Sequence, residues 1–209
     1  MKRLPQTLTA AVLTGALAFG GAAVAQAQIP DPVEDKPLTE MPTPTAEEET
    51  GTEDGEDPTR RWIVDPLDGT TNFLHGLPHW AVSIALEHKS EIVAAVIFDA
   101  AKDEMFVAEK GTGAYMNDQR LRVSGRTKLS ESVFSTGIPH AGTGPLPAMI
   151  QDLAQLMPAC AGVRGFGSAA LNLAYVAGGR FDGYWERGTK SWDVAAGILM
   201  VREAGGFVH

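Results

Sequence analysis

The feature that most constrains this chain of 209 residues is the stretch from Trp62 to Phe73, which reads Trp-Ile-Val-Asp-Pro-Leu-Asp-Gly-Thr-Thr-Asn-Phe. Its apolar start predicts a buried strand, and two carboxylates, Asp65 and Asp68, follow directly. Because the proline between them fixes its own φ and keeps the preceding residue extended, both carboxylates can point to one place. The sequence therefore predicts a strand that delivers two acid groups to a turn.

This turn has the groups that bind a cation and a phosphate side by side. Two close carboxylates share either a proton or a cation, and Mg²⁺ prefers one or two carboxylates together with substrate phosphate oxygens. Gly69, Thr70 and Thr71 offer a closely approaching backbone, N–H groups at the start of a short helix, and hydroxyl donors. An ordinary Asp-Gly turn with a helix cap is the alternative that these few residues leave open.

The whole stretch from Trp62 to Phe73 resembles the metal-binding signature of the inositol monophosphatase family, whose members are Mg²⁺-dependent phosphomonoesterases. A second stretch, Ser191 to Gly197 with Glu203-Ala204-Gly205-Gly206 behind it, is similar to that family's other signature. The resemblance runs from about Glu48 to His209. It implies an α/β fold with the α+β layers of the sugar phosphatases, without the family's N-terminal helices and C-terminal end, and a metal-dependent phosphoric monoester hydrolase.

The resemblance also implies roles for individual residues. The metal ligands would be Glu48, Asp65, the Leu67 carbonyl, Asp68 and Asp193, and the catalytic pair that aims a water would be Glu48 and Thr70. The substrate would be bound by Gly69, Thr70, Gly167, Ser168, Ala169, Glu186 and Asp193. The implied reaction is direct hydrolysis, in which one Mg²⁺ activates a water and a second stabilises the leaving alkoxide.

Three of these residues also have a plain structural interpretation. Glu48 lies among acidic residues that can simply be solvated, Ser168 can cap a helix without a ligand, and Asp193 can stabilise a helix dipole. The competing hypothesis is therefore a truncated, non-catalytic phosphatase-like protein that at most binds metal or phosphate. The family's missing helix pair would expose an apolar sheet surface, and catalysis should fail if Glu48 is only linker.

The residues before the family resemblance differ in composition. Residues 1–27 combine a basic start, an apolar run and a small-x-small site, which is typical of a secretory signal peptide; a membrane anchor is the alternative. Residues 28–46 are rich in proline and acidic side chains and predict an extended linker. We therefore expect a domain at 47–209, a periplasmic or secreted location, and no stable membrane span after cleavage.

The acidity of the chain is concentrated in one stretch, residues 31–57. Residues 31–57 hold eleven Asp and Glu against one Lys, a net charge of −10, while the whole chain carries −9. The remainder is nearly neutral and has no basic stripe that could neutralise a nucleic-acid backbone. We expect a small phosphomonoester as partner, such as inositol monophosphate or a related sugar or polyol phosphate, and no nucleic acid; a homodimer stays open.

Periodicity and turn residues predict the remaining elements. Ser168 should cap the clearest helix, and Gly178 should end it in the left-handed conformation. The single Cys160 cannot form an internal disulfide and is expected to be a small buried hydrophobe. An antiparallel meander is expected over 80–87, 92–98, 104–108, 113–116 and 121–124, further strands over 132–137 and 181–186, and helices over 145–157, 168–177 and 194–203.

Overall fold

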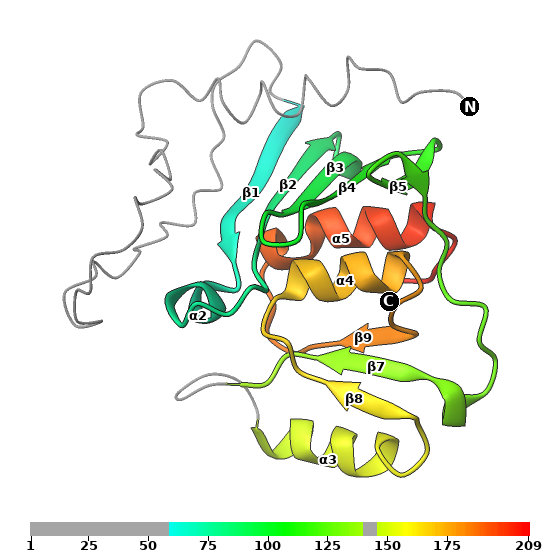
Figure 1. Ribbon diagram of the computed structural model, residues 1–209. Helices are drawn as coiled ribbons and strands as arrows, with labels where there is room; N and C mark the ends of the chain where they lie inside the picture. Colours follow the sequence, from blue (N-terminus) through cyan, green and yellow to red (C-terminus); the bar gives the residue numbers. More distant parts are fainter. Residues whose placement is uncertain (1–58, 140–145) are drawn as a thin grey trace. The chain divides into compact units, whose positions relative to one another are not determined.

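The computed structural model describes residues 59–139 and 146–209, and within them two β-sheets enclose a pair of helices (Figure 1). The larger sheet has six strands in the order β1-β2-β3-β4-β5-β6, and all neighbouring pairs are antiparallel. Its strands are β1 (Arg60–Asp68), β2 (Ala81–His88), β3 (Glu91–Asp99), β4 (Glu104–Glu109), β5 (Gly113–Met116) and β6 (Gln119–Arg120). The predicted meander is confirmed for its first four strands.

Short turns set the register of this meander. Lys89 and Ser90 join β2 to β3 with φ of 53° and 64°, and Asn117 and Asp118 join β5 to β6 with φ of 44° and 67°. Two successive residues with positive φ form the type I′ turn, whose twist matches that of the flanking strands.

The expected fifth strand over 121–124 is wrong. The ladder ends at Arg120, and the chain then leaves the sheet toward the helices. Leu121 is buried in the core, and the Val123 N–H donates to the carbonyl of Ala204, which follows the last helix. The Leu121 N–H still donates to the Ala114 carbonyl of β5 at 2.8 Å, and after it burial against another layer replaces strand pairing.

Two helices, α4 (Ala169–Ala177) and α5 (Ser191–Glu203), lie between the sheets (Figure 1). Gly197 allows them to approach closely, because a Cβ at this position would overlap the side chain of Leu173. The core between α5 and the larger sheet includes Ile63, Ile97 and Phe106, which are at most 3% exposed. This core fixes the strand that carries Asp65 and Asp68 relative to both helices.

The opposite face of the larger sheet is also apolar. The register aligns Val64, Ile84, Val96 and Val107 in one row across four strands, and these side chains are not part of the core around α5. An antiparallel sheet with one solvated face usually alternates apolar and polar residues. Both faces of this sheet therefore carry apolar side chains, but Ile84, Val96 and Val107 are at most 7% exposed, so the exposed apolar sheet surface expected from the sequence is not confirmed.

The smaller sheet is parallel and has the order β8-β7-β9. Its strands are β7 (Val133–Thr136), β8 (Gly162–Arg164) and β9 (Gly183–Trp185), and its connections include η2 (Leu129–Glu131) and α3 (Leu146–Leu156). Figure 1 shows α3 outside this sheet. A further short helix, α2 (Thr70–Leu74), follows β1.

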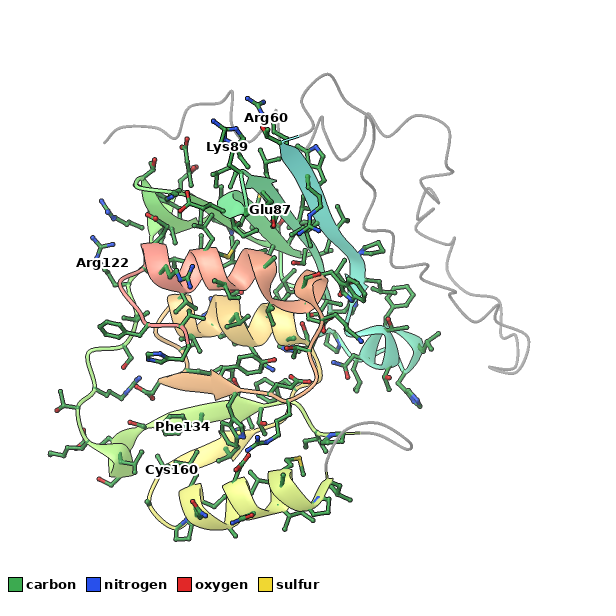
Figure 2. All side chains as sticks on the ribbon, turned by 180° about the vertical axis from the view of Figure 1, so that it is seen from behind. Arg60, Glu87, Lys89, Arg122, Phe134 and Cys160 are labelled. Carbon is green, nitrogen blue, oxygen red and sulfur yellow. The ribbon has the colours of Figure 1, made fainter. Side chains whose placement is uncertain are left out.

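Ser168 caps α4 as predicted, because its side chain accepts the Leu171 N–H. The predicted left-handed end at Gly178 is wrong: Gly178 has φ of −85°, and Gly179, with φ of +67°, makes the left-handed turn. A Cβ on Gly179 would lie 3.1 Å from the Arg122 carbonyl oxygen, so the segment after β6 crowds this residue. Cys160 has a free thiol and is half-buried rather than fully buried, close to the strand that holds Phe134 (Figure 2).

None of the helices in residues 59–139 and 146–209 is long and apolar enough to span a membrane. The expected signal peptide, the linker and Glu48 lie outside the described residues.

Candidate active site

The turn after β1 is shaped by an extra residue on this strand. Asp65 pairs with Ser83 and Asp68 with Ala81, so the register shifts between the two carboxylates. A bulge of this kind bends a strand and redirects its side chains, and prolines such as Pro66 are tolerated there. Asp65 and Asp68 are each 8% exposed, so two acid groups are buried within one turn.

Local hydrogen bonds hold the turn in shape. Asp65 Oδ1 accepts the N–H of Leu67 at 3.0 Å, and the Thr70 hydroxyl donates to the Leu67 carbonyl at 3.0 Å. Gly69 has φ of +91°, which favours glycine, and a Cβ there would lie 3.1 Å from the His79 carbonyl oxygen. The sequence motif therefore supplies a glycine where the backbone needs one.

Asp68 is bound by the first turn of α4, about a hundred residues further along the chain. Asp68 Oδ2 accepts the Ser168 hydroxyl and, at 2.9 Å, the Ala170 N–H, while Oδ1 lies 3.3 Å from the Ala169 nitrogen. The N–H groups at a helix start have no partner within the helix and favour an anion. The structure thus brings Asp68 together with Ser168 and Ala169, which were predicted to bind substrate.

Two further carboxylates, those of Asp65 and Asp193, lie close enough to influence Asp68, and the three are called the acid cluster below. Burial, aided by the charges of Asp65 and Asp193, raises the pKa of Asp68 to about 7, although its bonds from Ser168 and Ala170 act in the opposite direction. Burial also raises the pKa of Asp193. Burial and neighbouring negative charges destabilise the ionised form of a carboxylate. A cation nearby has the opposite effect and stabilises that form.

Asp193 lies in the first turn of α5, as predicted. Its Oδ2 accepts the N–H of Lys190, the residue before the helix, at 2.6 Å. This bond satisfies an N–H at the start of the helix. The Asp193 side chain can therefore stabilise the helix dipole and also act in the acid cluster.

The model of the inositol monophosphatase family matches residues 27–209. The chain belongs to the inositol monophosphatase family. An inositol-1-monophosphatase from Mesorhizobium japonicum is 58% identical over 161 residues, which cover 77% of this chain and 60% of that protein. A Nus factor SuhB from Pasteurella multocida is 49% identical over 161 residues, with the same 77% and 60% coverage.

The fold agrees with this assignment. The crystal structure of the extragenic suppressor protein suhB from Bartonella henselae matches with a TM-score of 0.71 and 57% identity, over 73% of this chain and 59% of that chain. The predicted fold class is thereby confirmed. The chain spans about three fifths of the length of the relatives it matches.

The acid cluster has the donor chemistry for the Mg²⁺ that the family implies. Within residues 59–139 and 146–209, no group of three or more His, Cys, Asp or Glu side chains is arranged closely enough to hold a metal ion alone. Mg²⁺ does not require such a group, since it keeps several waters and binds one or two carboxylates with phosphate oxygens. Asp65 and Asp68 supply hard oxygens, and a carboxylate can accept more bonds than Asp68 receives from α4.

Glu186 follows β9 and lies at the surface, close enough to Asp193 to be influenced by its charge. Partial burial of its carboxyl group raises its pKa, and the charge of Asp193 acts in the same direction. The Tyr184 hydroxyl donates to Glu186 Oε2 at 2.6 Å, and a Cβ on Gly137 would overlap the Glu186 carboxyl group. A tyrosine and a glycine therefore fix the acid that was predicted to bind a substrate hydroxyl.

Sequence reasoning assigned no role to Asn72 or Tyr184. The Asn72 amide donates to the His79 carbonyl at 2.8 Å and to the Phe166 carbonyl at 2.6 Å, which ties α2 to the loop before α4. Asn72 could have been noticed because it stands inside the opening motif. Tyr184 could have been noticed from its spacing, since residues two apart on a strand share a face.

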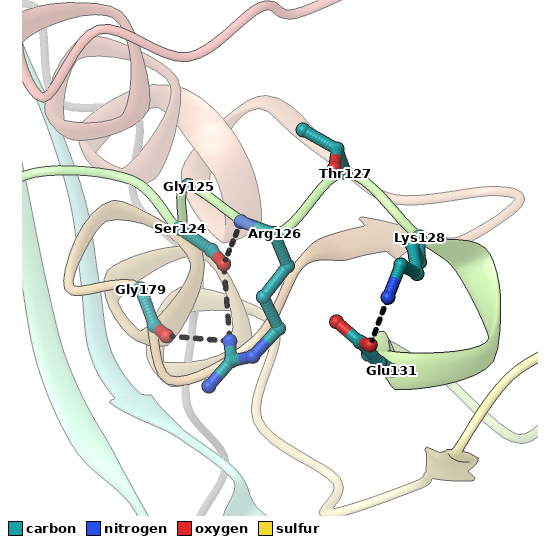
Figure 3. A pocket seen from close by; sticks show the side chains of 7 residues that line it. All are labelled: Ser124, Gly125, Arg126, Thr127, Lys128, Glu131 and Gly179. Atoms are coloured by element: carbon teal, nitrogen blue, oxygen red, sulfur yellow. Dashed lines mark hydrogen bonds and ion pairs between the residues drawn. The ribbon is translucent and has the colours of Figure 1, made fainter.

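The structure also has an open hollow of about 610 Å³ that lies elsewhere and is lined by none of the predicted site residues (Figure 3). Its charges are paired: Arg126 contacts Asp182 at 3.2 Å, and Lys128 contacts Glu131 at 3.0 Å. Ser124 accepts from Arg126 as well. These pairs leave the hollow without a cation that favours an added anion, so it is a poor candidate for the phosphate site.

Proposed function

We propose that this chain hydrolyses a phosphomonoester in an Mg²⁺-dependent reaction, with inositol monophosphate or a related sugar or polyol phosphate as substrate. One observation carries the proposal: the first turn of α4 binds the carboxylate of Asp68. Burial and the charges of Asp65 and Asp193 raise the pKa of this carboxylate. A metal phosphatase needs carboxylates for a cation and N–H donors for a phosphate in the same place. Membership of the inositol monophosphatase family supports the same reaction.

Each residue of the chain has a defined task in this proposal. Thr70, whose hydroxyl bonds to the Leu67 carbonyl at 3.0 Å, would hold the attacking water together with Glu48. The backbone of Gly69 and of Gly167, Ser168 and Ala169 would bind the phosphate and the adjoining part of the substrate. Asp193 and Glu186 would accept hydrogen bonds from its hydroxyl groups.

Glu48, Asp65, the Leu67 carbonyl, Asp68 and Asp193 would hold the Mg²⁺. When bound, the ion supplies positive charge that lowers the pKa of a water and stabilises the leaving oxygen. The hydrolysis then converts water and the phosphomonoester into an alcohol and inorganic phosphate, without a phosphorylated side chain.

The proposal is tested with the full chain on a panel of phosphomonoesters, with Asp193→Asn beside the wild type. An asparagine can still accept the Lys190 N–H, so the α5 start should stay intact, whereas the negative charge is lost. We expect turnover to fall at least about 100-fold, the range found when a group that stabilises the transition state is removed. An active Asp193→Asn enzyme would refute the assignment.

A matched control is Asp118→Asn. Asp118 lies in the β5–β6 turn with φ of 67°, a conformation that asparagine also tolerates, and it is not among the acids that influence Asp68. This variant removes one surface charge and should keep the wild-type rate. Loss of activity in both variants would indicate a general effect of charge rather than a role of Asp193.

A second candidate is a non-catalytic protein of this family that binds metal or phosphate only. It is favoured by the lack of a three-ligand acid group in the part of the chain that the structure describes. The two candidates separate on the substrate panel: a folded sample that binds Mg²⁺ but releases no phosphate from any substrate supports the second.

We further propose that residues 1–27 direct export and are removed, which leaves a linker over 28–46, the phosphatase domain over 47–209 and no membrane span. The basic start and the apolar run of the first segment support this. Cell fractionation with N-terminal sequencing tests it: a periplasmic or secreted product that begins near Gln28 is expected. An uncleaved chain in the cytoplasm would contradict it.

A small-molecule substrate, rather than a nucleic acid, is proposed as the partner, because the residues outside 31–57 are nearly neutral and form no basic stripe. Binding of single- or double-stranded nucleic acid at physiological salt would contradict this part of the proposal.

A further inference from the structure

Asn72 joins three segments of backbone beside the proposed site. Its Nδ2 lies 2.8 Å from the His79 carbonyl oxygen, 2.6 Å from that of Phe166 and 3.4 Å from that of Gly167. An amide nitrogen has two hydrogens, so the two short contacts are full hydrogen bonds and the third is weaker. One side chain on α2 therefore holds both the loop that leads to β2 and the loop that leads to α4.

This junction is tightly packed. Gly167 has φ of +76°, and a Cβ on it would lie 3.2 Å from Asn72 Nδ2. Gly69 approaches the same place, since its Cβ would lie 3.1 Å from the His79 carbonyl oxygen and 3.2 Å from that of Gly167. Two glycines thus make room for the amide bonds, and the backbone has little freedom to shift around them.

The helix that carries Asn72 has few other anchors. α2 has five residues, and none of their side chains is buried. Phe73 touches Trp80 edge to face, with ring centroids 5.2 Å apart, but its own side chain is 39% exposed. The Asn72 amide is therefore a principal link between α2 and the rest of the fold.

The segment that Asn72 holds carries the proposed phosphate-binding groups. Gly167 directly precedes Ser168 and Ala169, and Ser168 and Ala170 bind the carboxylate of Asp68. Asp68 and Asn72 lie at the two ends of one turn, so each fixes the same pair of segments from a different side. We infer that Asn72 is a positioning residue: it sets the spacing between the acid turn at 65–70 and the start of α4, and it touches neither metal nor substrate.

This inference rests on the proposed phosphatase function and adds a residue to it. An aspartate at position 72 would turn a carboxylate toward two carbonyl oxygens, which cannot donate to it, and an alanine would leave these carbonyls without their donor. Displacement of a binding group by about 1 Å can lower catalysis by about 100-fold. We therefore expect Asn72→Ala and Asn72→Asp to lower kcat/KM for phosphate release by about 10- to 100-fold.

Asn117→Ala provides a matched control. Asn117 also bridges two segments with its amide: Nδ2 donates to the Asp103 carbonyl at 2.8 Å, and Oδ1 accepts the Met105 N–H at 2.9 Å. It lies in the β5–β6 turn, away from the acid cluster. Its loss should lower stability toward urea in a similar way but leave kcat/KM within about twofold of wild type.

Hydrogen exchange of the α4 amides gives a readout that does not require activity. Asn72→Ala should accelerate exchange at Ala169 and Ala170 by at least about tenfold and leave Tyr175 and Val176 in the same helix unchanged. If the Asn72 variants match Asn117→Ala in kcat/KM, or if exchange at the start of α4 is unaltered, the inference is wrong. If the wild type releases no phosphate, the proposed function fails, and hydrogen exchange still decides whether Asn72 positions this turn.

Discussion

The contact between Ser168 and Asp68 allows a quantitative prediction of stability. Ser168 has two partners, since it donates to the Asp68 carboxylate and accepts the Leu171 N–H as the cap of α4. Loss of a helix cap costs about 1 kcal/mol, and loss of a hydrogen bond to a charged group costs about 1.5–3 kcal/mol. Ser168→Ala should therefore lower the free energy of unfolding by about 2.5–4 kcal/mol.

A double-mutant cycle separates the two contributions. In an Asp68→Asn background the cap is still lost, but the bond to position 68 is now a neutral one, worth about 0.5–1.5 kcal/mol. Ser168→Ala should then cost about 1.5–2.5 kcal/mol, which leaves a coupling of about 1 kcal/mol between the two residues.

Urea unfolding followed by tryptophan fluorescence measures all four variants. The measurement should be made near pH 8.5, because the pKa of Asp68 is raised to about 7 and the carboxyl must be ionised. If Ser168→Ala costs the same in both backgrounds, the residues are not coupled, and the contribution of the Asp68 charge to its bond with Ser168 is refuted.

Two further predictions concern packing and pH. Gly197→Ala should destabilise the fold by about 1–3 kcal/mol in urea unfolding, because the added methyl group would overlap Leu173. Gly125→Ala is the control: a Cβ at this position has open space, so the variant should cost less than about 0.5 kcal/mol. Equal losses of stability in the two variants would contradict the packing argument. Burial and the charge of Lys102 lower the pKa of His79 to about 4, so the folded state binds fewer protons than the unfolded state between that value and about 6.5. Stability should therefore fall as the pH drops through this range. With solvent screening allowed for, the fall should be about 1–2 kcal/mol larger in the wild type than in His79→Gln. Identical pH profiles of unfolding for the two proteins would contradict this prediction.

Strand positions followed from the sequence because apolar residues and turn residues alternate at the right spacing. The Asn117-Asp118 pair forms a hairpin turn, since these residue types tolerate positive φ. The segment at 121–124 looked like one more strand, yet Leu121 packs into the core between the layers instead. A local pattern cannot distinguish these outcomes, because both bury the same side chains.

The candidate site was predictable in its parts but not in its assembly. The turn with Asp65 and Asp68 and the cap at Ser168 each followed from local chemistry. Their direct contact joins positions a hundred residues apart, and only the packing of α4 against the larger sheet produces it. The three carbonyls bound by Asn72 could not be predicted for the same reason.

The central claim is tested most directly by phosphate release from inositol 1-phosphate by the full chain, with and without Mg²⁺, beside Asp65→Asn. The account predicts release that requires Mg²⁺ and falls at least about 100-fold in the variant, because Asp65 is a proposed metal ligand. Release without Mg²⁺, or release that survives in Asp65→Asn, would contradict the proposed mechanism. A folded sample that releases no phosphate from this substrate or from the phosphomonoester panel would contradict the enzymatic function itself.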